Sequence, residues 1–214
     1  MMQKRIKNEA CKTGVSRVIC LIVGHIKMKF CHMKIIYQVD EALPYLKMGC
    51  ILAYPTEAVY GLGCDPFNEK AVNTLLKLKQ RERGKGLILL ISDWAQLELL
   101  KGTVPEDRLN AVRETWPGPI TWIFPKSAMI PEWICGDHSS IAVRMSAHPM
   151  ARALCKEGPI VSTSANIAGN PPAMDEASVH HAFPEGIDVV LSGPLGGNKQ
   201  PSMIYDVLKG NRLR

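Results

Sequence analysis

The sequence predicts one α/β domain, and three observations support this fold class. Short apolar runs rich in β-branched residues alternate with amphipathic helical patterns, which is typical of α/β proteins. With 214 residues, 46% of them apolar, the chain can bury one substantial core. No internal repeat, low-complexity tract or long linker appears after residue 33, so nothing in the pattern divides that part of the chain.

The secondary-structure elements follow from the period of the apolar residues, which is about two in strands and 3.6 in helices. Strands are predicted, in order, at 34–39, 50–54, 86–91, 120–124, 141–145, 159–162, 188–191 and 203–207. Helices are predicted at 40–48, 69–80, 93–100, 106–115, 148–157 and 174–183. Trp116-Pro117-Gly118-Pro119 ends the helix 106–115, because proline cannot continue a helix and glycine permits a reversal.

The positive charge of the chain is concentrated at its beginning. The formal net charge is +6, but residues 1–34 hold eight Lys and Arg against the single acid Glu9. The remaining residues carry 18 basic and 19 acidic side chains and are close to neutral, so the overall charge says little about partners. No apolar run approaches the roughly 18 residues that span a bilayer, so an integral membrane protein is not expected.

Residues 1–32 are predicted to be an N-terminal extension, either disordered or upstream of the true start. The apolar stretch 18–23 is too short for a signal peptide, and Lys27 and Lys29 follow where a small-residue cleavage site would stand. Met33 directly precedes the first predicted strand. The folded domain is therefore expected over residues 33–214.

The cysteines indicate a reducing compartment. Their number, seven, is odd, and no two form a C-x-x-C pair, so free thiols and a cytoplasmic location are expected. A zinc site in the leading segment can be imagined, but its spacing fits no common ligand arrangement, and no metal ligands are assigned. Its members would be Cys11, Cys20, His25, Cys31 and His32.

Lys79 continues the apolar stripe of the helix predicted at 69–80. Val72, Leu75, Leu76 and Lys79 stand at i, i+3, i+4 and i+7, so the ammonium group points toward the interior or a cleft. Burying an unpaired ammonium is costly, and a ligand phosphate is a suitable partner. Alternatively, the alkyl stem covers the core and the ammonium group reaches water.

Polar side chains stand at the ends of three predicted strands. The turn 162–166, with the sequence Ser-Thr-Ser-Ala-Asn, follows one apolar run, Thr56 follows another, and Arg144 stands near the end of a third. Ligands of open α/β sheets bind at the carboxyl ends of strands. Lys79 and Arg81 would add two cations, which suits a polyphosphate. The sequence therefore predicts a nucleotide site.

Several segments of the chain form an ordered set of motifs. They are Tyr54-Pro55-Thr56-Glu57-Ala58-Val59-Tyr60-Gly61-Leu62-Gly63-Cys64-Asp65-Pro66, Lys79-Gln80-Arg81, Lys85-Gly86-Leu87-Ile88-Leu89, Trp116-Pro117-Gly118-Pro119-Ile120-Thr121, Ala142-Val143-Arg144 with Pro149 beyond, Ser162-Thr163-Ser164-Ala165-Asn166 and Pro201-Ser202. With these motifs the chain resembles the YrdC-like family, the threonylcarbamoyl-AMP synthases of transfer-RNA modification. The resemblance covers roughly residues 34–210 and is strongest to the short bacterial members, which lack a second C-terminal domain.

The resemblance implies a twisted, curved mixed sheet flanked by helices, with a large concave cleft. It also implies the synthesis of threonylcarbamoyl-AMP and pyrophosphate from L-threonine, bicarbonate and ATP, for the t6A modification at adenosine 37 of transfer RNAs that read ANN codons. Magnesium is expected to arrive with ATP, held by phosphate oxygens and water. A transient contact with the transfer-RNA threonylcarbamoyl transferase complex is implied, and weak binding of transfer RNA is a further expectation.

The family motifs assign expected roles position by position. Lys79 and Arg81 match the K-x-R motif and are expected to be catalytic and to bind ATP. The other expected ATP-binding residues are Ser164, Asn166, Thr121 and Arg144. The expected threonine-binding residues are Thr56, Lys85 and Ser162.

Two other functions compete with this reading. A non-catalytic RNA-binding protein would use the cations at positions 77, 79, 81, 83 and 85, although no aromatic residues are interleaved there for base stacking. Carbamoyl transfer from carbamoyl phosphate, as in the related domain of hydrogenase-maturation proteins, is the remoter alternative, because the accessory domains of those larger proteins are missing.

Overall fold

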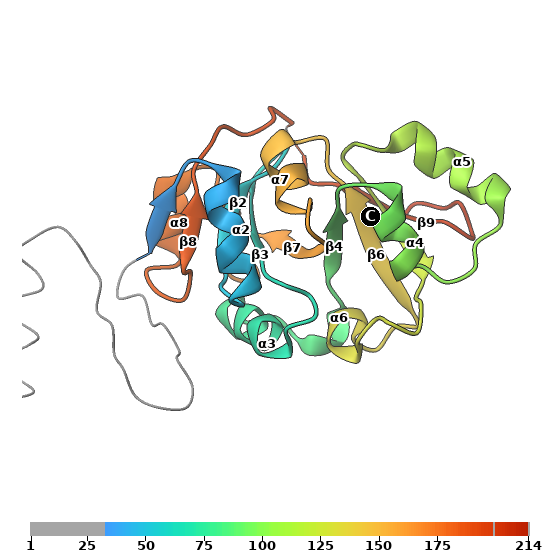
Figure 1. Ribbon diagram of the computed structural model, residues 1–214, viewed down its shortest axis with the longest axis horizontal. Helices are drawn as coiled ribbons and strands as arrows, with labels where there is room; N and C mark the ends of the chain where they lie inside the picture. The colour runs from blue at the N-terminus through green and yellow to red at the C-terminus, as the bar shows by residue number, and fades with distance from the viewer. Residues whose placement is uncertain (1–32, 199, 214) are drawn as a thin grey trace, which may run out of the picture. The chain divides into compact units, whose positions relative to one another are not determined.

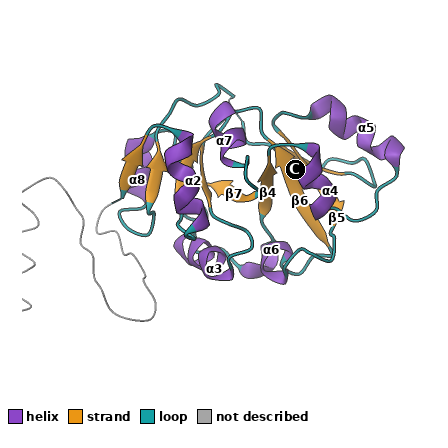
Figure 2. Ribbon diagram, viewed as in Figure 1, coloured by secondary structure: helices purple, strands orange, loops and turns teal. Residues whose placement is uncertain are grey.

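The computed structural model describes residues 33–198 and 200–213, in which the strands form one mixed sheet (Figures 1 and 2). The strand order is β1-β8-β2-β3-β7-β4-β6-β5-β9. The strands are β1 (Lys34–Ile36), β2 (Leu52–Pro55), β3 (Tyr60–Gly63), β4 (Ile88–Ile91), β5 (Ile120–Pro125), β6 (Ser140–Met145), β7 (Ile160–Ser164), β8 (Val189–Leu191) and β9 (Met203–Asp206). The helices are α2 (Val39–Lys47), α3 (Glu69–Leu78), α4 (Trp94–Leu100), α5 (Glu106–Thr115), α6 (Glu132–Cys135), α7 (Pro149–Leu154), α8 (Glu176–Ala182) and the 3-10 turn η1 (Arg83–Lys85).

The α/β class is confirmed, and every predicted strand and helix is present, with ends that differ from the prediction by no more than a few residues. The first strand is shorter than predicted, because Val39 begins α2, whose first turn carries Asp40 and Glu41 where the helix dipole favours acids. The sequence did not predict β3 or the short helix α6. Half of the residues in β3 are glycines, which are normally depleted in strands.

Some predictions concern residues that the structure does not describe. The extension at 1–32, including the imagined zinc ligands, lies outside the described residues, so the boundary at residue 33 stays a prediction. In the described ranges, no helix is long and apolar enough to cross a membrane. The cysteines found there are free thiols, as predicted: Cys50, Cys64, Cys135 and Cys155.

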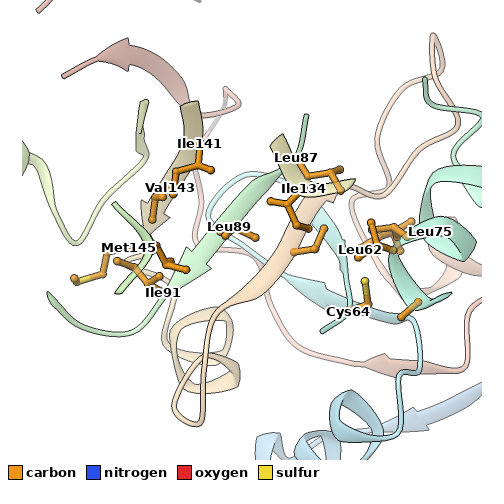
Figure 3. Packing of buried hydrophobic residues seen from close by; sticks show 14 of the residues in the cluster. Leu62, Cys64, Leu75, Leu87, Leu89, Ile91, Ile134, Ile141, Val143 and Met145 are labelled. Carbon is orange, nitrogen blue, oxygen red and sulfur yellow. The ribbon is translucent and has the colours of Figure 1, made fainter. Parts of the chain in front are cut away.

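The helices cover the two faces of the sheet unequally. Successive residues of a strand point to opposite faces, so Leu89 and Ile91 of β4 join the larger core while Leu90 joins the smaller one. Figure 3 shows part of the larger core, where Leu75 of α3 and Ile134 of α6 meet strand side chains. On the other face, α2 and α7 lie side by side against the strands (Figure 1). Beyond α7, this second face lines a cleft.

The two glycines of β3 make room for the ring of Tyr54. A Cβ atom at Gly61 would lie 3.2 Å from the ring, and one at Gly63 would lie 2.9 Å from it. The ring belongs to β2, and its hydroxyl reaches past β3 to donate a hydrogen bond to Ser162 Oγ on β7, at 2.8 Å. The glycines of the Tyr-Gly-Leu-Gly sequence therefore make room for the Tyr54 side chain, which links β2 to β7 across β3 and fixes Ser162 by its hydrogen bond.

The connection from β8 to β9 joins strands near opposite ends of the strand order (Figure 1). On its way it is bound to the segment that follows β2. Gly196 N donates to Thr56 O at 3.0 Å, and Asn198 N donates to Glu57 O at 2.8 Å. Earlier in the connection, Gly193 O accepts a hydrogen bond from the hydroxyl of Tyr60 at 2.8 Å. The residues after this crossing lead into β9, which pairs with β5.

Candidate functional site

The cleft has a volume of about 430 Å³ and lies on the sheet face that α2 and α7 leave uncovered. Residues of neighbouring strands form the floor of the cleft, because residues that pair directly across strands lie on the same face of the sheet. Ile88 pairs with both Ser162 and Ala142, and Ala142 also pairs with Ile123. All four line the cleft, together with Gly61 of β3.

The predicted site residues divide into two groups. Six line the cleft: Thr56, Arg81, Lys85, Arg144, Ser162 and Ser164. The other three do not: Lys79, Asn166 and Thr121. Members of the second group touch members of the first or other lining residues, so they lie directly behind the cleft wall.

The idea that these residues meet at the carboxyl ends of strands is wrong for Arg144. Strand β6 is parallel to β4, and β4 is antiparallel to β7, so β6 and β7 end at opposite edges of the sheet. Arg144 reaches the cleft because it stands two residues after Ala142, on the same face of β6. The site is therefore assembled on a face of the sheet, with contributions from strands of both directions.

The K-x-R spacing coincides with the end of α3. The helix ends at Leu78, Lys79 is its C-terminal cap, and Gln80 adopts a left-handed conformation with φ of 51°. Arg81 N donates to Leu76 O and Gln80 N donates to Lys77 O, the hydrogen bonds of a Schellman motif. Because of this turn, Lys79 is buried behind the cleft wall, whereas Arg81 lines the cleft itself.

Lys79 is buried, as its place in the apolar stripe predicts, but its partners are carbonyl groups. Nζ donates to the main-chain oxygen of Ser164, to the main-chain oxygen of Asn166 at 2.7 Å, and to Asn166 Oδ1 at 3.4 Å. An ammonium group has three N–H donors, so all of them are engaged. Burial, and secondly the positive charge of Arg81, lower the pKa of Lys79 from 10.5 to about 8.

The turn after β7 is organised around Asn166. Ser164 Oγ donates to Asn166 Oδ1 at 2.6 Å, and Asn166 Nδ2 donates to Asn170 O at 2.7 Å. Ser164 remains exposed and lines the cleft. In the S-x-N motif, Ser164 therefore faces the cleft and Asn166 holds the turn. The ammonium group of Lys79 binds main-chain oxygens of both residues.

Arg81 and Lys85 supply cations at the rim near η1. Arg81 Nη2 donates to Gly86 O at 2.9 Å, which ties the guanidinium group to the outgoing loop. Lys85 is exposed, and its Nζ lies 3.2 Å from a carboxylate oxygen of the exposed Glu82. Such a surface ion pair contributes little to stability, so the ammonium group of Lys85 can turn toward a ligand.

Hydroxyl groups supply the remaining polar surface of the cleft. Thr56 is buried, and its Oγ1 donates to Val59 O at 2.7 Å, leaving the oxygen lone pairs for a ligand donor. Ser162 accepts from Tyr54 and can donate in turn. Thr121 is fully buried, and its Oγ1 donates to Ser202 Oγ at 3.1 Å, so it supports a lining residue from below.

Glu57 is a cleft residue that the sequence analysis did not single out. Its side chain is 8% exposed and lies 3.4 Å from the guanidinium group of Arg144, which is 10% exposed. It is the one carboxylate among the described lining residues, against Arg81, Lys85 and Arg144. Its position directly after Thr56 in the Tyr-Pro-Thr-Glu segment could have indicated that Glu57 belongs to the site. No local pattern indicates that its partner, Arg144, lies in β6.

The five alternating cations at 77–85 do not form one exposed row. Lys79 is buried, whereas Arg83 and Lys85 are paired with Glu69 and Glu82. Lys77 is exposed on α3, and Arg81 lines the cleft. This distribution does not favour a continuous nucleic-acid surface.

The side chains that the structure describes do not form a protein-built metal site. In the described part of the chain, no group of three His, Cys, Asp or Glu side chains is placed to hold a metal ion. Among the described lining residues of the cleft, Glu57 is the sole carboxylate, and it faces Arg144. The donor set therefore fits a magnesium ion only if the phosphate oxygens of a nucleotide and water supply its ligands.

The chain is similar to several known proteins. The family model Sua5_yciO_yrdC, described as Telomere recombination, matches residues 44–214. The chain is 48% identical over 178 residues to a threonylcarbamoyl-AMP synthase of Coxiella burnetii (strain RSA 493 / Nine Mile phase I), covering 82% of this chain and 96% of that protein. It is 45% identical over 179 residues to a protein of the same name from Pseudomonas fluorescens (strain Pf0-1), covering 83% and 97%.

Among solved structures, P. abyssi Sua5 complexed with L-threonine superposes with a TM-score of 0.76 at 32% identity. The match covers 81% of this chain and 54% of the P. abyssi chain, so the chain spans about half of that longer protein. The family model covers most of the chain, and the bacterial relatives match over nearly their full length. The chain belongs to the Sua5, YciO and YrdC family.

Proposed function

We propose that the protein is a threonylcarbamoyl-AMP synthase that joins L-threonine, bicarbonate and ATP, for the t6A modification of transfer RNA. The relatives from Coxiella burnetii and Pseudomonas fluorescens (strain Pf0-1) that carry this name are 48% and 45% identical to the chain over about four fifths of its length. The observation that carries the proposal is the composition of the cleft. Its lining combines three cations with hydroxyl groups, from Arg81, Lys85 and Arg144 and from Thr56, Ser162 and Ser164. Cations suit a polyphosphate, and hydroxyl groups orient a small amino acid.

The nucleotide would bind where α3 and the turn after β7 meet. Arg81 and Ser164 line the cleft there and would contact phosphate oxygens, with Arg144 approaching from the floor. Lys79 would act mainly by its charge and by holding the turn, because its three donors already bind Ser164 and Asn166. Asn166 would hold Ser164 in place. Thr121 would support the nucleotide side through Ser202.

Threonine would bind beside the segment after β2. Thr56 offers an acceptor and Ser162 a donor at neighbouring points of the cleft. Lys85 would meet the carboxylate of the amino acid from the rim. P. abyssi Sua5 was solved with L-threonine, so a related protein of this fold accepts that ligand.

The reaction requires the protein mainly to align the substrates and to stabilise negative charge on the phosphates. The amine of threonine combines with bicarbonate to give a carbamate and water. A carbamate oxygen then attacks the α-phosphorus of ATP, and the bond to the bridging oxygen breaks, so pyrophosphate leaves with the electron pair. Arg81, Arg144 and Lys79 would stabilise the charge that develops on the phosphates. Magnesium, when bound with ATP, would neutralise part of the same charge.

The proposal is tested by measuring pyrophosphate release from ATP, with threonine and bicarbonate each present or omitted. We expect release only when both are present, together with threonylcarbamoyl-AMP identified by mass spectrometry. Serine and valine are matched controls, because they lack the methyl or the hydroxyl group of threonine. Release that does not depend on an amino acid, or none under any combination, would refute the synthase assignment.

The pKa of Lys79 predicts how ATP affinity depends on pH. Because the pKa is lowered to about 8, the ammonium form prevails below that pH and the neutral amine above it. We therefore expect ATP affinity to fall as pH rises through about 8. Arginine stays charged in this range, so a Lys79→Arg protein that folds should lose this decrease. Calorimetric titration with ATP from pH 7.5 to 9.5 measures both proteins, and identical profiles would contradict the prediction.

The partners and the location follow from the chemistry of the product. A mixed anhydride of a carbamate and a phosphate hydrolyses readily, so we propose direct transfer to the threonylcarbamoyl transferase complex through a transient contact. We propose a cytoplasmic location, where ATP, threonine and transfer RNA are all present. The free thiols of the described cysteines are compatible with that compartment.

A further inference from the structure

Glu57 is the single carboxylate among the described residues that line a cationic cleft, and its two oxygens have different surroundings. Oε1 accepts a hydrogen bond from Ser146 Oγ at 2.8 Å and another from Ala147 N at 2.9 Å. Oε2 is buried, has no hydrogen-bond partner in the described part of the chain, and lies 3.4 Å from Arg144 Nη2. One oxygen therefore fixes the carboxylate through two hydrogen bonds, and the other faces the guanidinium group of Arg144.

The carboxylate of Glu57 stabilises Arg144 in the cleft when no ligand is bound. The side chain of Arg144 is 10% exposed, so much of its hydration is lost. An unpaired buried guanidinium group would turn toward water or be unstable. The charge of Glu57 offsets this cost, while the loose contact of 3.4 Å leaves guanidinium donors available to an incoming anion.

The main chain of Glu57 also joins two segments that are far apart in sequence. Its carbonyl oxygen accepts from Asn198 N, and Thr56 O accepts from Gly196 N. A Cβ atom at Gly196 would lie 2.9 Å from the Cα atom of Glu57, so the connection from β8 to β9 crosses in direct contact. Glu57 thus fixes the end of β6, and with it Arg144, relative to the connection that carries Pro201 and Ser202 to the cleft.

We propose that Glu57 is a positioning residue of the synthase reaction, which holds Arg144 in the orientation that receives the anionic substrate. The inference rests on the proposed function. Glu57 acts through Arg144 and contacts neither ATP nor threonine. In this role it takes no proton from the amine of threonine. Removing Glu57 should matter only while Arg144 is present.

The test is a double-mutant cycle with Glu57→Gln and Arg144→Gln, read as kcat/KM for pyrophosphate release and as ATP affinity. Glutamine keeps an acceptor for Ser146 and Ala147 but turns an N–H donor toward the guanidinium group. We expect Glu57→Gln to lower kcat/KM roughly tenfold to a hundredfold in the native background and less than about twofold in the Arg144→Gln background. Glu106→Gln, which breaks an exposed ion pair on α5, is the matched control and should leave kcat/KM unchanged.

A second variant covers the case in which Glu57→Gln does not fold. Ser146→Ala removes one hydrogen bond to Oε1 and keeps the charge of Glu57. It should give a smaller loss of kcat/KM, about threefold to tenfold, that also disappears in the Arg144→Gln background. Losses of equal size in both backgrounds, for either variant, would mean that Glu57 acts independently of Arg144 and would overturn the inference.

The two readouts separate failure of this inference from failure of the proposed function. If the native protein forms no threonylcarbamoyl-AMP, the proposed function fails, and the cycle is read from ATP affinity alone. Non-additive losses of ATP affinity would then still support the Glu57–Arg144 coupling. If the product forms but the losses are additive, the synthase assignment stands and the role of Glu57 is refuted.

Discussion

Replacing Lys79 with alanine is expected to lower kcat/KM for pyrophosphate release by about 100- to 1,000-fold. The substitution removes a positive charge behind the phosphate site and removes the Nζ donor to the carbonyl oxygens of Ser164 and Asn166, of which Ser164 O keeps its hydrogen bond from Asn166 N. The turn that carries Ser164 would lose these side-chain contacts with the end of α3 and keep the main-chain hydrogen bond from Ala168 N to Lys79 O. Because the partly buried carbonyl oxygen of Asn166 would lose its donor, we also expect the free energy of unfolding to fall by about 1–3 kcal/mol.

Two further variants separate the causes of this loss. Lys77→Ala removes the same kind of side chain from the exposed side of the same helix and should change neither kcat/KM nor stability appreciably. Lys79→Met keeps most of the buried volume and removes the charge and the donors. If Lys79→Met retained activity close to that of the native protein, the ammonium group would have no role in the reaction.

Replacing Gly63 with alanine is expected to destabilise the fold by about 3 kcal/mol or more. The added Cβ atom would lie 2.4 Å from Val161 O and 2.9 Å from the ring of Tyr54, so both the β3–β7 spacing and the ring would have to move. Movement of the ring would break its hydrogen bond to Ser162 in the cleft. Urea unfolding and pyrophosphate release, measured on the same preparation, should both show the loss.

Gly61→Ala is the matched comparison, since Gly61 lies two residues earlier on the same face of β3. There the added atom would be 3.2 Å from the Tyr54 ring and 3.3 Å from a methyl group of Thr56. Side chains can shift by a few tenths of an ångström more easily than a paired strand can, so we expect a loss of about 1 kcal/mol. Equal losses for the two alanines would show that contact with the Val161 carbonyl is unimportant.

The sequence predicted the elements well where a local pattern decides them. The stripe of Val72, Leu75 and Leu76 places α3 and buries Lys79, because the helical period acts within a few residues. The end of α3 at Leu78 was less predictable, since the left-handed turn falls on Gln80 and not on a glycine. The motifs then identified the segments that the fold brings together at the cleft.

What the sequence could not predict depends on contacts between distant residues. Strand β3 is defined by the ring of Tyr54 and by its pairing with β2 and β7, and not by strand-forming side chains. Glu57 meets Ser146 across 89 residues of sequence, so no local pattern indicates the pair. The direction of β6, and hence the route by which Arg144 enters the cleft, follows only from the complete strand order.

The crossing from β8 to β9 implies an order of assembly during synthesis. Strands β2 and β3 are neighbours in sequence and can pair early, whereas Gly196 and Asn198 bind Thr56 and Glu57 only after some 140 further residues have been made. Strand β9 completes the edge beside β5 later still. Closure of such long loops is slow compared with local pairing. A nascent chain halted before residue 192 would therefore carry K-x-R and S-x-N and still lack a finished cleft.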